Sequence, residues 1–218
     1  MNHDGILFDL DGTLWEVMNE TYHSANIVTK KYNMDEIPLN KICSTFGFNS
    51  LETAKSYFPN LDIKTALKIS AEISEVNIDY LQKNGGHLYP HLEDTLKNLN
   101  YNYSLFIVSN SGHTQYIEAF LNSSGLSKYF KDYIAASALN LTKADAILKI
   151  KKDYDLKKAI YIGDTKKDLE ATLVAKVPFI HARYGFCKNL DTKYYIDSLK
   201  DLPDEIKKIY LTLEWFSF

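Results

Sequence analysis

The sequence predicts an α/β fold in which a doubly wound, mainly parallel sheet carries an inserted α-helical cap. In the later part of the chain, short apolar runs alternate with stretches of helical periodicity, which is the pattern of parallel βαβ units. Earlier, roughly 90 residues separate the first apolar run from the second, far more than one crossover helix needs. The chain therefore has room for a helical insertion within one α/β core.

Five apolar runs are the predicted strands of the sheet. Each run is short and nearly continuous, as in strands that are buried on both faces. They cover residues 5–8, 104–108, 133–136, 159–162 and 178–182. Helical periodicity predicts helices over residues 114–122, 142–154 and 168–176, and a final helix over 205–218.

The insertion is predicted to be a small helical cap over residues 16–86, so that residues 1–15 and 87–218 form the core. Proline and glycine residues separate its helices, and the Asn-Gly-Gly sequence at 84–86 is typical of a flexible return to the core. The helical spacing of apolar residues extends over 19–32, 50–57 and 63–83.

Composition and charge narrow the classes of function. The 218 residues carry a formal net charge of -3 and no cluster of basic side chains, which argues against a surface for nucleic acid or an anionic membrane. The N-terminal residues lack a basic segment and a long apolar stretch, so we expect a cytoplasmic protein without a leader or membrane span. Cys43 and Cys187 have no metal-ligand spacing and are expected to be reduced thiols.

The first predicted strand ends in a pair of acids. Asp9 and Asp11 follow the apolar residues 5–8 within the motif DLDGTL. Side chains alternate along an extended backbone, so both carboxylates point the same way at the strand end where α/β sheets bind ligands. They can share a hard cation, and one can act as a nucleophile while the other moves protons. The alternative is an acidic turn in which Gly12 only allows the bend.

The second predicted strand ends in small polar residues. Ser109 and Asn110 begin the sequence SNSG, which directly follows the apolar run. A serine hydroxyl and free backbone amides can cradle an anionic group, although the same composition is common in ordinary turns.

Two predicted helix starts carry the remaining candidates. Thr142 begins a capping box that places Lys143 in the first helical turn, where the helix dipole disfavours a cation, so the lysine is either exposed or paired with an anion. Asp164 directly follows a predicted strand, as the first acid of the chain does. Asp168 can form a capping box with Thr165, and that role is compatible with support of a metal site.

These elements resemble, in order and spacing, the four motifs of the haloacid dehalogenase-like hydrolase superfamily: DLDGTL at 9–14, a serine at 109, a lysine at 143 and GDTKKD at 163–168. The match spans essentially the whole chain. The helical insertion, and Tyr89-Pro90 before an amphipathic helix, resemble the branch of phosphoglycolate phosphatase and β-phosphoglucomutase. The resemblance implies a Rossmann-like core with a helical cap, and Mg²⁺ as the cofactor.

The resemblance also implies a role for each acid. Asp9 would attack phosphorus and form an aspartyl-phosphate, while Asp11 would protonate the leaving oxygen and later deprotonate the attacking water. The metal ligands would be the carboxylates of Asp9 and Asp164 and the backbone carbonyl of Asp11, with Asp168 supporting the metal site. The second acid favours phosphate chemistry, because dehalogenases attack carbon and need no leaving-group acid there.

The phosphoryl oxygens would be bound by Ser109, Asn110 and Lys143. The expected function is Mg²⁺-dependent hydrolysis of a small phosphorylated metabolite by a monomer or homodimer. One alternative is a sugar-phosphate phosphomutase like β-phosphoglucomutase, which would use the same nucleophile. Another is a non-catalytic binding protein that retains the fold.

Substrate choice is expected to lie in the cap. Residues 46–50 (FGFNS) are the candidate loop facing the active site, although a simple interhelical turn explains them equally well. Arg183 is the only arginine in the chain, so any bidentate clamp on a carboxylate or phosphate must use it or is absent. For His113, a surface or core position is favoured over a substrate contact. Residues 15–19 lack the Asp-Ser pair common in related sequences. The resemblance therefore implies nothing about the details of the hinge between core and cap or of the substrate.

Overall fold

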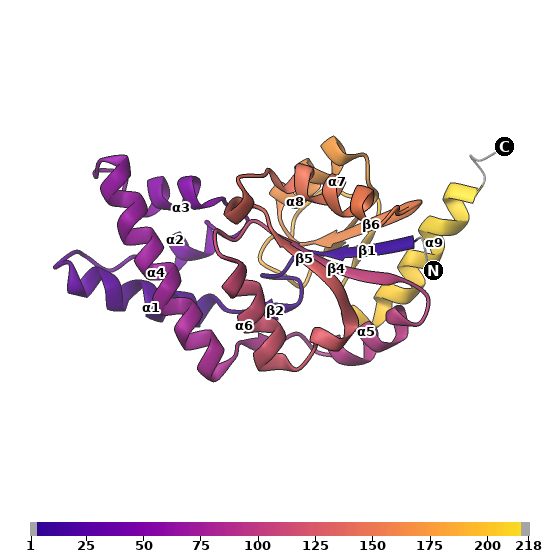
Figure 1. Ribbon diagram of the computed structural model, residues 1–218, viewed down its shortest axis with the longest axis horizontal. Coiled ribbons are helices and arrows are strands. Elements are labelled where there is room, and N and C mark those ends of the chain that lie inside the picture. Colours follow the sequence, from indigo (N-terminus) through magenta and orange to yellow (C-terminus); the bar gives the residue numbers. More distant parts are fainter. Residues whose placement is uncertain (1–3, 215–218) are drawn as a thin grey trace.

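A computed structural model describes residues 4–214 and places a parallel sheet between two layers of helices (Figure 1). Within these residues the sheet has six strands, in the order β5-β4-β1-β6-β7-β8. The strands are β1 (Asp4–Phe8), β4 (Ser104–Ser109), β5 (Phe130–Ala135), β6 (Lys158–Gly163), β7 (Phe179–Ala182) and β8 (Tyr195–Ile196). Since the first strand lies in the middle and every described pairing in this sheet is parallel, the predicted doubly wound α/β fold is confirmed.

The strands of the sheet are buried on both faces. Ile6 and Phe8 of β1 pack into one apolar cluster and Leu7 packs into the other, as alternation along a strand requires. The first face is covered by α5 (Leu92–Asn100), α6 (Thr114–Ser124) and α9 (Leu202–Glu214), and the second by α7 (Lys143–Asp153) and α8 (Lys166–Ala175). Short 3₁₀ helices cover Ser127–Tyr129, Ser137–Leu139 and Leu199–Asp201.

Four helices lie together at one end of the sheet, on the left in Figure 1. Their apolar side chains form a cluster of their own, which includes Val28, Ile42 and Ile69. The helices are α1 (Met18–Lys31), α2 (Leu39–Cys43), α3 (Ser50–Tyr57) and α4 (Ile63–Asn84). A short antiparallel ribbon of β2 (Trp15–Glu16) and β3 (His87–Leu88) leads to and from them. The domain boundaries expected from the sequence fall at this ribbon.

Several short elements have no counterpart in the sequence pattern. The ribbon, α2 and β8 each span only two to five residues, too few for a period to show. The strand expected at 133–136 instead begins at Phe130, because half-exposed residues obscure its apolar pattern. The predicted final helix is described as far as Glu214, and its last four residues lie outside the described part. Among the described residues, no helix has the length and apolar character needed to span a membrane.

Candidate active site

Three neighbouring strands bring predicted site residues to one edge of the sheet. Asp9 follows β1, Ser109 ends β4 and Asp164 follows β6. The strand β1 lies between the other two and is parallel to both, so all three carboxyl ends meet. The backbone N–H of Asp9 donates to the carbonyl of Ile162 at 2.8 Å, which fixes the first motif against β6.

Lys143 lies between two buried carboxylates. Its Nζ is 2.9 Å from Oδ1 of Asp9 and 2.5 Å from Oδ1 of Asp168, and none of the three side chains is more than 5% exposed. The capping box of Thr142 and Asp145 starts α7 at this lysine, as predicted, so the lysine is paired with anions and is not a surface residue. Burial alone would lower the pKa of Lys143, but Asp168 and Asp9 more than offset this effect and raise it.

Both carboxylate oxygens of Asp168 are occupied by protein donors. Its Oδ2 accepts from the backbone N–H of Thr165 at 3.0 Å and from the hydroxyl of Thr165 at 2.6 Å, in the capping box predicted for α8. Its Oδ1 accepts from Lys143 and, at 3.3 Å, from the hydroxyl of Tyr161. Asp168 therefore ties the lysine to the start of α8.

Asp9, Asp164 and Asp168 form a buried acidic cluster, in which one oxygen of each lies within 4.8 Å of the others. Burial and the neighbouring carboxylates raise the pKa of Asp9 to about 7 and raise that of Asp164 well above its ordinary value. Three carboxylates against one ammonium leave an excess of negative charge that a divalent cation would neutralise. Carboxylate oxygens are ligands that Mg²⁺ prefers, so this donor set fits the expected cofactor.

Gly12 allows the first motif to approach Asp164 closely. Its φ is +75°, and a Cβ at this position would lie 2.2 Å from Oδ2 of Asp164. The same Oδ2 accepts the backbone N–H of Phe186 at 2.7 Å. A side chain at position 12 would be strained and would displace the carboxylate, so the glycine does more than allow a bend.

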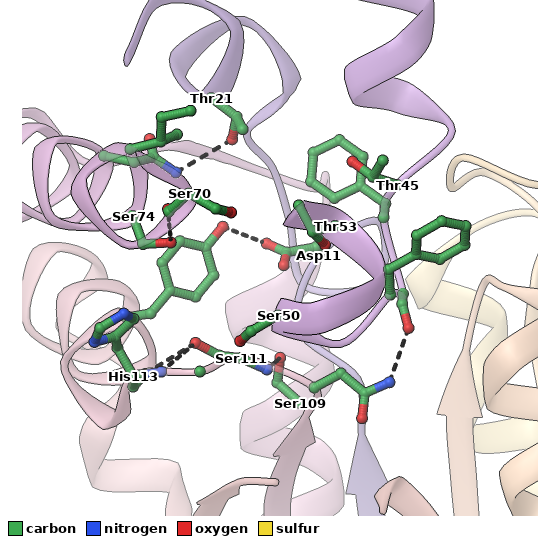
Figure 2. Close-up of a pocket in the computed structure, with 18 of the residues that line it drawn as sticks. Asp11, Thr21, Thr45, Ser50, Thr53, Ser70, Ser74, Ser109, Ser111 and His113 are labelled. Atoms are coloured by element: carbon green, nitrogen blue, oxygen red, sulfur yellow. Dashed lines mark hydrogen bonds between the residues drawn. The ribbon is translucent and has the colours of Figure 1, made fainter. Parts of the chain in front are cut away.

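Asp11 lies in a different environment from Asp9. Its Oδ1 accepts the indole N–H of Trp15 at 2.7 Å and the hydroxyl of Tyr116 at 2.8 Å. Figure 2 draws Asp11 beside the cavity, with the bond from the tyrosine as a dashed line. Burial raises the pKa of Asp11 to about 6, although the hydrogen bonds from Tyr116 and Trp15 act to lower it. Both donors bind the same oxygen, and within residues 4–214 the other oxygen, Oδ2, makes no hydrogen bond.

Ser109 and Asn110 lie at the sheet edge but differ in what they contact. Ser109 is buried, and its Oγ accepts the backbone N–H of Ser111 at 3.3 Å. The side-chain nitrogen of Asn110 donates to the carbonyl of Gly47 at 2.8 Å. The amide of Asn110 therefore contacts the helical insertion through one of its two N–H donors.

A cavity of about 360 Å³ lies between the sheet edge and the inserted helices (Figure 2). Four residues of the loop 46–50 line it, which confirms that this loop faces the candidate site. His113 also lines the cavity, although the sequence favours a surface or core position for it. The side chains expected to carry the chemistry line it from the core: Asp9, Asp11, Ser109 and Lys143.

Arg183 is not among the residues that line this cavity. Its guanidinium donates to both carboxylate oxygens of Asp197, at 2.9 and 2.6 Å, and lies 3.5 Å from the ring centroid of Tyr195. Because the chain has no other arginine, the cavity has no arginine clamp for a carboxylate or a phosphate.

The sequence reasoning missed the donors to Asp11 and a polar stripe on α4. Nothing local marks Trp15 and Tyr116, because they meet the carboxylate only in the folded chain. The stripe consists of Ser70, Ser74 and Asn77, which all line the cavity. Their spacing of four and three residues places them on one helix face, and this signal is present in the sequence.

Comparison with known proteins gives consistent matches. Residues 6–182 match the family model described as haloacid dehalogenase-like hydrolase. A phosphoglycolate phosphatase from Photobacterium profundum is 26% identical over 193 residues, which cover 83% of this chain and 83% of that protein. The crystal structure of a predicted phosphatase from Clostridium acetobutylicum has a TM-score of 0.77 at 26% identity, covering 94% of this chain and 98% of the other. A β-phosphoglucomutase from Clostridium difficile shares the fold, with a TM-score of 0.74 at 16% identity over 95% of this chain and 98% of its own.

Proposed function

Because the chain belongs to the haloacid dehalogenase-like hydrolase family, we propose that it is a Mg²⁺-dependent phosphatase of small metabolites that works through an aspartyl-phosphate on Asp9. The family model matches residues 6–182 and identifies the chain as a hydrolase, as expected from the sequence. The phosphatase names of relatives over most of its length support a phosphate ester as the bond that is hydrolysed.

One observation carries the proposal, namely the contrast between two carboxylates that are two residues apart. Asp9 is paired with Lys143 within the acidic cluster, whereas Asp11 is bound by the neutral donors Trp15 and Tyr116. A cation held at the acidic cluster would favour an ionised nucleophile, and a neutral setting favours a group that gains and loses a proton. The two environments therefore suit two different roles.

In the first step, Asp9 attacks the phosphorus with Oδ2, the oxygen that Lys143 does not contact. The bond from phosphorus to the leaving oxygen breaks as Asp11 gives that oxygen its proton, which yields an alcohol and an aspartyl-phosphate. Lys143 and Ser109 hold the phosphoryl oxygens during the transfer.

In the second step, the ionised Asp11 takes a proton from a water molecule that attacks the phosphorus. The bond from phosphorus to the Asp9 oxygen breaks, and inorganic phosphate leaves. Asp9 returns to its carboxylate form and Asp11 to its protonated form, so the enzyme is ready for another turnover.

The charges of the acids explain why a cation is needed. Without one, burial and the neighbouring carboxylates raise the pKa of Asp9 to about 7, which works against an ionised nucleophile. Mg²⁺, held by the carboxylates of Asp9 and Asp164 and the carbonyl of Asp11, would favour the ionised form of Asp9 and neutralise charge on the phosphoryl oxygens. Asp168, with both oxygens occupied, supports the site by positioning Lys143.

We also propose a division into two domains. Residues 16–86 act as a cap, and residues 1–15 and 87–218 form the core that carries the reacting groups. The side chain of Asn110 donates to the carbonyl of Gly47 and so holds the cap loop against the sheet edge, as expected for a cap that closes over the site. An ion pair between Lys167 and Glu52 at 2.8 Å makes a second link. A closed cap would exclude bulk water from the reacting groups.

The proposal is tested by release of phosphate from p-nitrophenyl phosphate, with Mg²⁺ and with a chelator. Turnover is expected only with the metal, and it should fall to background in Asp9→Asn. Asp153→Asn, which removes an exposed carboxylate paired with Lys149, is the matched control and should retain turnover.

Three results would contradict the proposal. Turnover retained in Asp9→Asn would exclude Asp9 as the nucleophile. A requirement for a sugar bisphosphate, together with slow net hydrolysis, would indicate a phosphomutase. Folded protein that releases phosphate from no member of a broad metabolite panel would indicate a binding protein.

A further inference from the structure

We propose that the natural substrate is the phosphate ester of a neutral, hydroxyl-rich alcohol, such as a sugar or polyol monophosphate, and not the ester of a carboxylated alcohol. The inference rests on the proposed function, because it concerns the leaving group that would occupy the same cavity. The charge of the cavity and the hydrogen-bonding state of its hydroxyls support it.

The cavity has no free cation for a carboxylate on the substrate. Of the described side chains that line it, Lys143 alone carries a permanent positive charge, and its Nζ already pairs with Asp9 and Asp168. A carboxylate on the leaving group would therefore lie in a cavity that Asp9 and Asp11 also line, where the imidazole of His113 is the one other described side chain able to carry positive charge. The carboxylates of Asp9 and Asp11 would repel it without a fixed cation to offset them, which disfavours its binding.

Two further cations, Arg183 and Lys167, have partners elsewhere. Arg183 is bound to Asp197 and does not line the cavity. Lys167 makes an ion pair with Glu52 at 2.8 Å, and it does not line the cavity either. Phosphoglycolate, the substrate named for several relatives, carries the kind of carboxylate for which this cavity offers no partner.

The cap instead lines the cavity with hydroxyls that lack a partner. Ser70 of α4 is only 8% exposed, yet within residues 4–214 its Oγ makes no hydrogen bond. Ser50, which is exposed, and Thr53, which is half-buried, lie on α3 and add two cavity-lining hydroxyls that make no hydrogen bond among the described residues. The Oγ of Ser70 is therefore open to the cavity with its hydrogen-bonding capacity unused by the protein, and a polar ligand placed there can take it up.

Ser74, one turn along the same helix, shows the contrast. Its Oγ donates to the carbonyl of Ser70 at 3.1 Å, which is the usual way in which a helical serine satisfies itself. Figure 2 shows both serines beside the cavity, with Asp11 facing the same space. Ser70 is therefore the hydroxyl of this helix that is left for a substrate.

A hydroxyl both donates and accepts, so a hydroxyl of the substrate can use both of its functions, whereas a carboxylate can only accept. The polar side chains come from three cap helices, since Thr21 of α1 also lines the cavity and accepts from Asn77 at 3.3 Å. A cavity of about 360 Å³ lies at the small end of the usual range for ligand sites, as a small sugar or polyol requires.

The first test uses two esters that differ in one group. Phosphoglycolate carries a carboxylate where hydroxyethyl phosphate carries a hydroxymethyl group, and glycerol phosphate adds a further hydroxyl. We expect kcat/KM for hydroxyethyl and glycerol phosphate to exceed that for phosphoglycolate by about tenfold or more. An equal or higher value for phosphoglycolate would overturn the inference.

Turnover of p-nitrophenyl phosphate separates this inference from the proposed function. If the aryl ester is hydrolysed and phosphoglycolate is preferred among the alkyl esters, only the inference fails. If no ester is hydrolysed by folded protein with Mg²⁺, the proposed function fails as well.

Two variants test the cavity directly. Ser70→Ala should lower kcat/KM for glycerol phosphate by about fivefold, a greater loss than for the aryl ester, because one hydrogen bond to the substrate is removed. The control is Ser124→Ala, at a residue that does not line the cavity. This change removes a hydroxyl that donates to the Phe120 carbonyl at 2.6 Å, and it should leave kcat/KM unchanged for both esters. Equal losses on both esters in Ser70→Ala would contradict the assignment.

Ser74→Lys supplies the missing cation. It should raise the ratio of kcat/KM for phosphoglycolate to that for hydroxyethyl phosphate by about fivefold or more. A correctly folded Ser74→Lys protein with an unchanged ratio would show that the lack of a cation does not exclude the carboxylate.

Discussion

Phe46 stacks on Phe186, with ring centroids 4.1 Å apart and ring planes inclined by 17°. Phe46 lies in the loop between α2 and α3 that lines the cavity, and Phe186 lies in a core loop after β7. The backbone N–H of Phe186 donates to Oδ2 of Asp164 at 2.7 Å. The same core residue therefore contacts the cap and one carboxylate of the acidic cluster.

Phe46→Ala should loosen the closed cap. Stacked aromatic pairs contribute about 0.5–1.5 kcal/mol beyond their buried area, so we expect kcat/KM for a metabolite ester to fall about two- to tenfold. The control is Tyr103→Ala, which removes a similar stack on Tyr210 with ring centroids 5.6 Å apart. Tyr103 directly precedes β4 and so lies at the end of that strand away from the candidate site. Steady-state kinetics that change equally in the two variants would rule out a specific effect of the cap contact.

Tyr116→Phe should move the pH dependence of the reaction. The hydroxyl of Tyr116 lowers the pKa of Asp11, so its loss should raise that pKa, and the protonated acid would persist to higher pH. For an alkyl ester, the fall in kcat/KM at high pH should therefore shift upward by about one pH unit, as expected for one hydrogen bond to a charged group.

Tyr133→Phe is the matched control for this profile. It removes a hydroxyl that donates to Glu118 at 3.1 Å, a partner on the same helix as Tyr116 but outside the cavity. Its pH profile should coincide with that of the unmodified enzyme. A downward shift in Tyr116→Phe, or the same shift in both variants, would be incompatible with the role given to Asp11.

Magnesium should stabilise the folded protein through the acidic cluster. The melting temperature should rise with Mg²⁺ in the unmodified protein and should rise much less in Asp164→Asn. The rise should be larger at pH 8 than at pH 5.5, because the pKa of Asp9, about 7, means that a proton must leave before the cation binds. Equal metal-induced shifts in the two proteins would exclude Asp164 as a ligand.

The fold was predictable because its long elements carry strong patterns. The buried central strands are nearly continuous apolar runs, and the acid, serine and lysine positions lie where those strands end or helices begin. Capping boxes gave the starts of α7 and α8, since both are local interactions between residues three positions apart.

The partners of Asp11 were not predictable in the same way. Tyr116 is 105 positions from Asp11, and its hydrogen bond depends on how α6 packs against the first motif. The contact of Asn110 with the cap likewise depends on the tertiary arrangement. The serine stripe of α4 was accessible in principle, but helical spacing alone does not show whether a polar face meets solvent or a cavity.

The central claim is that Asp9 forms a covalent phosphoryl intermediate. The most direct measurement is the mass of the Asp11→Asn protein after reaction with p-nitrophenyl phosphate and Mg²⁺, followed by mapping of the modified peptide. An aryl leaving group needs little acid catalysis, whereas hydrolysis of the intermediate needs the base, so the intermediate should accumulate. We predict a gain of one phosphoryl group on Asp9. A protein that releases nitrophenol while no phosphoryl group is found on Asp9, or while one is found on another residue, would contradict the account.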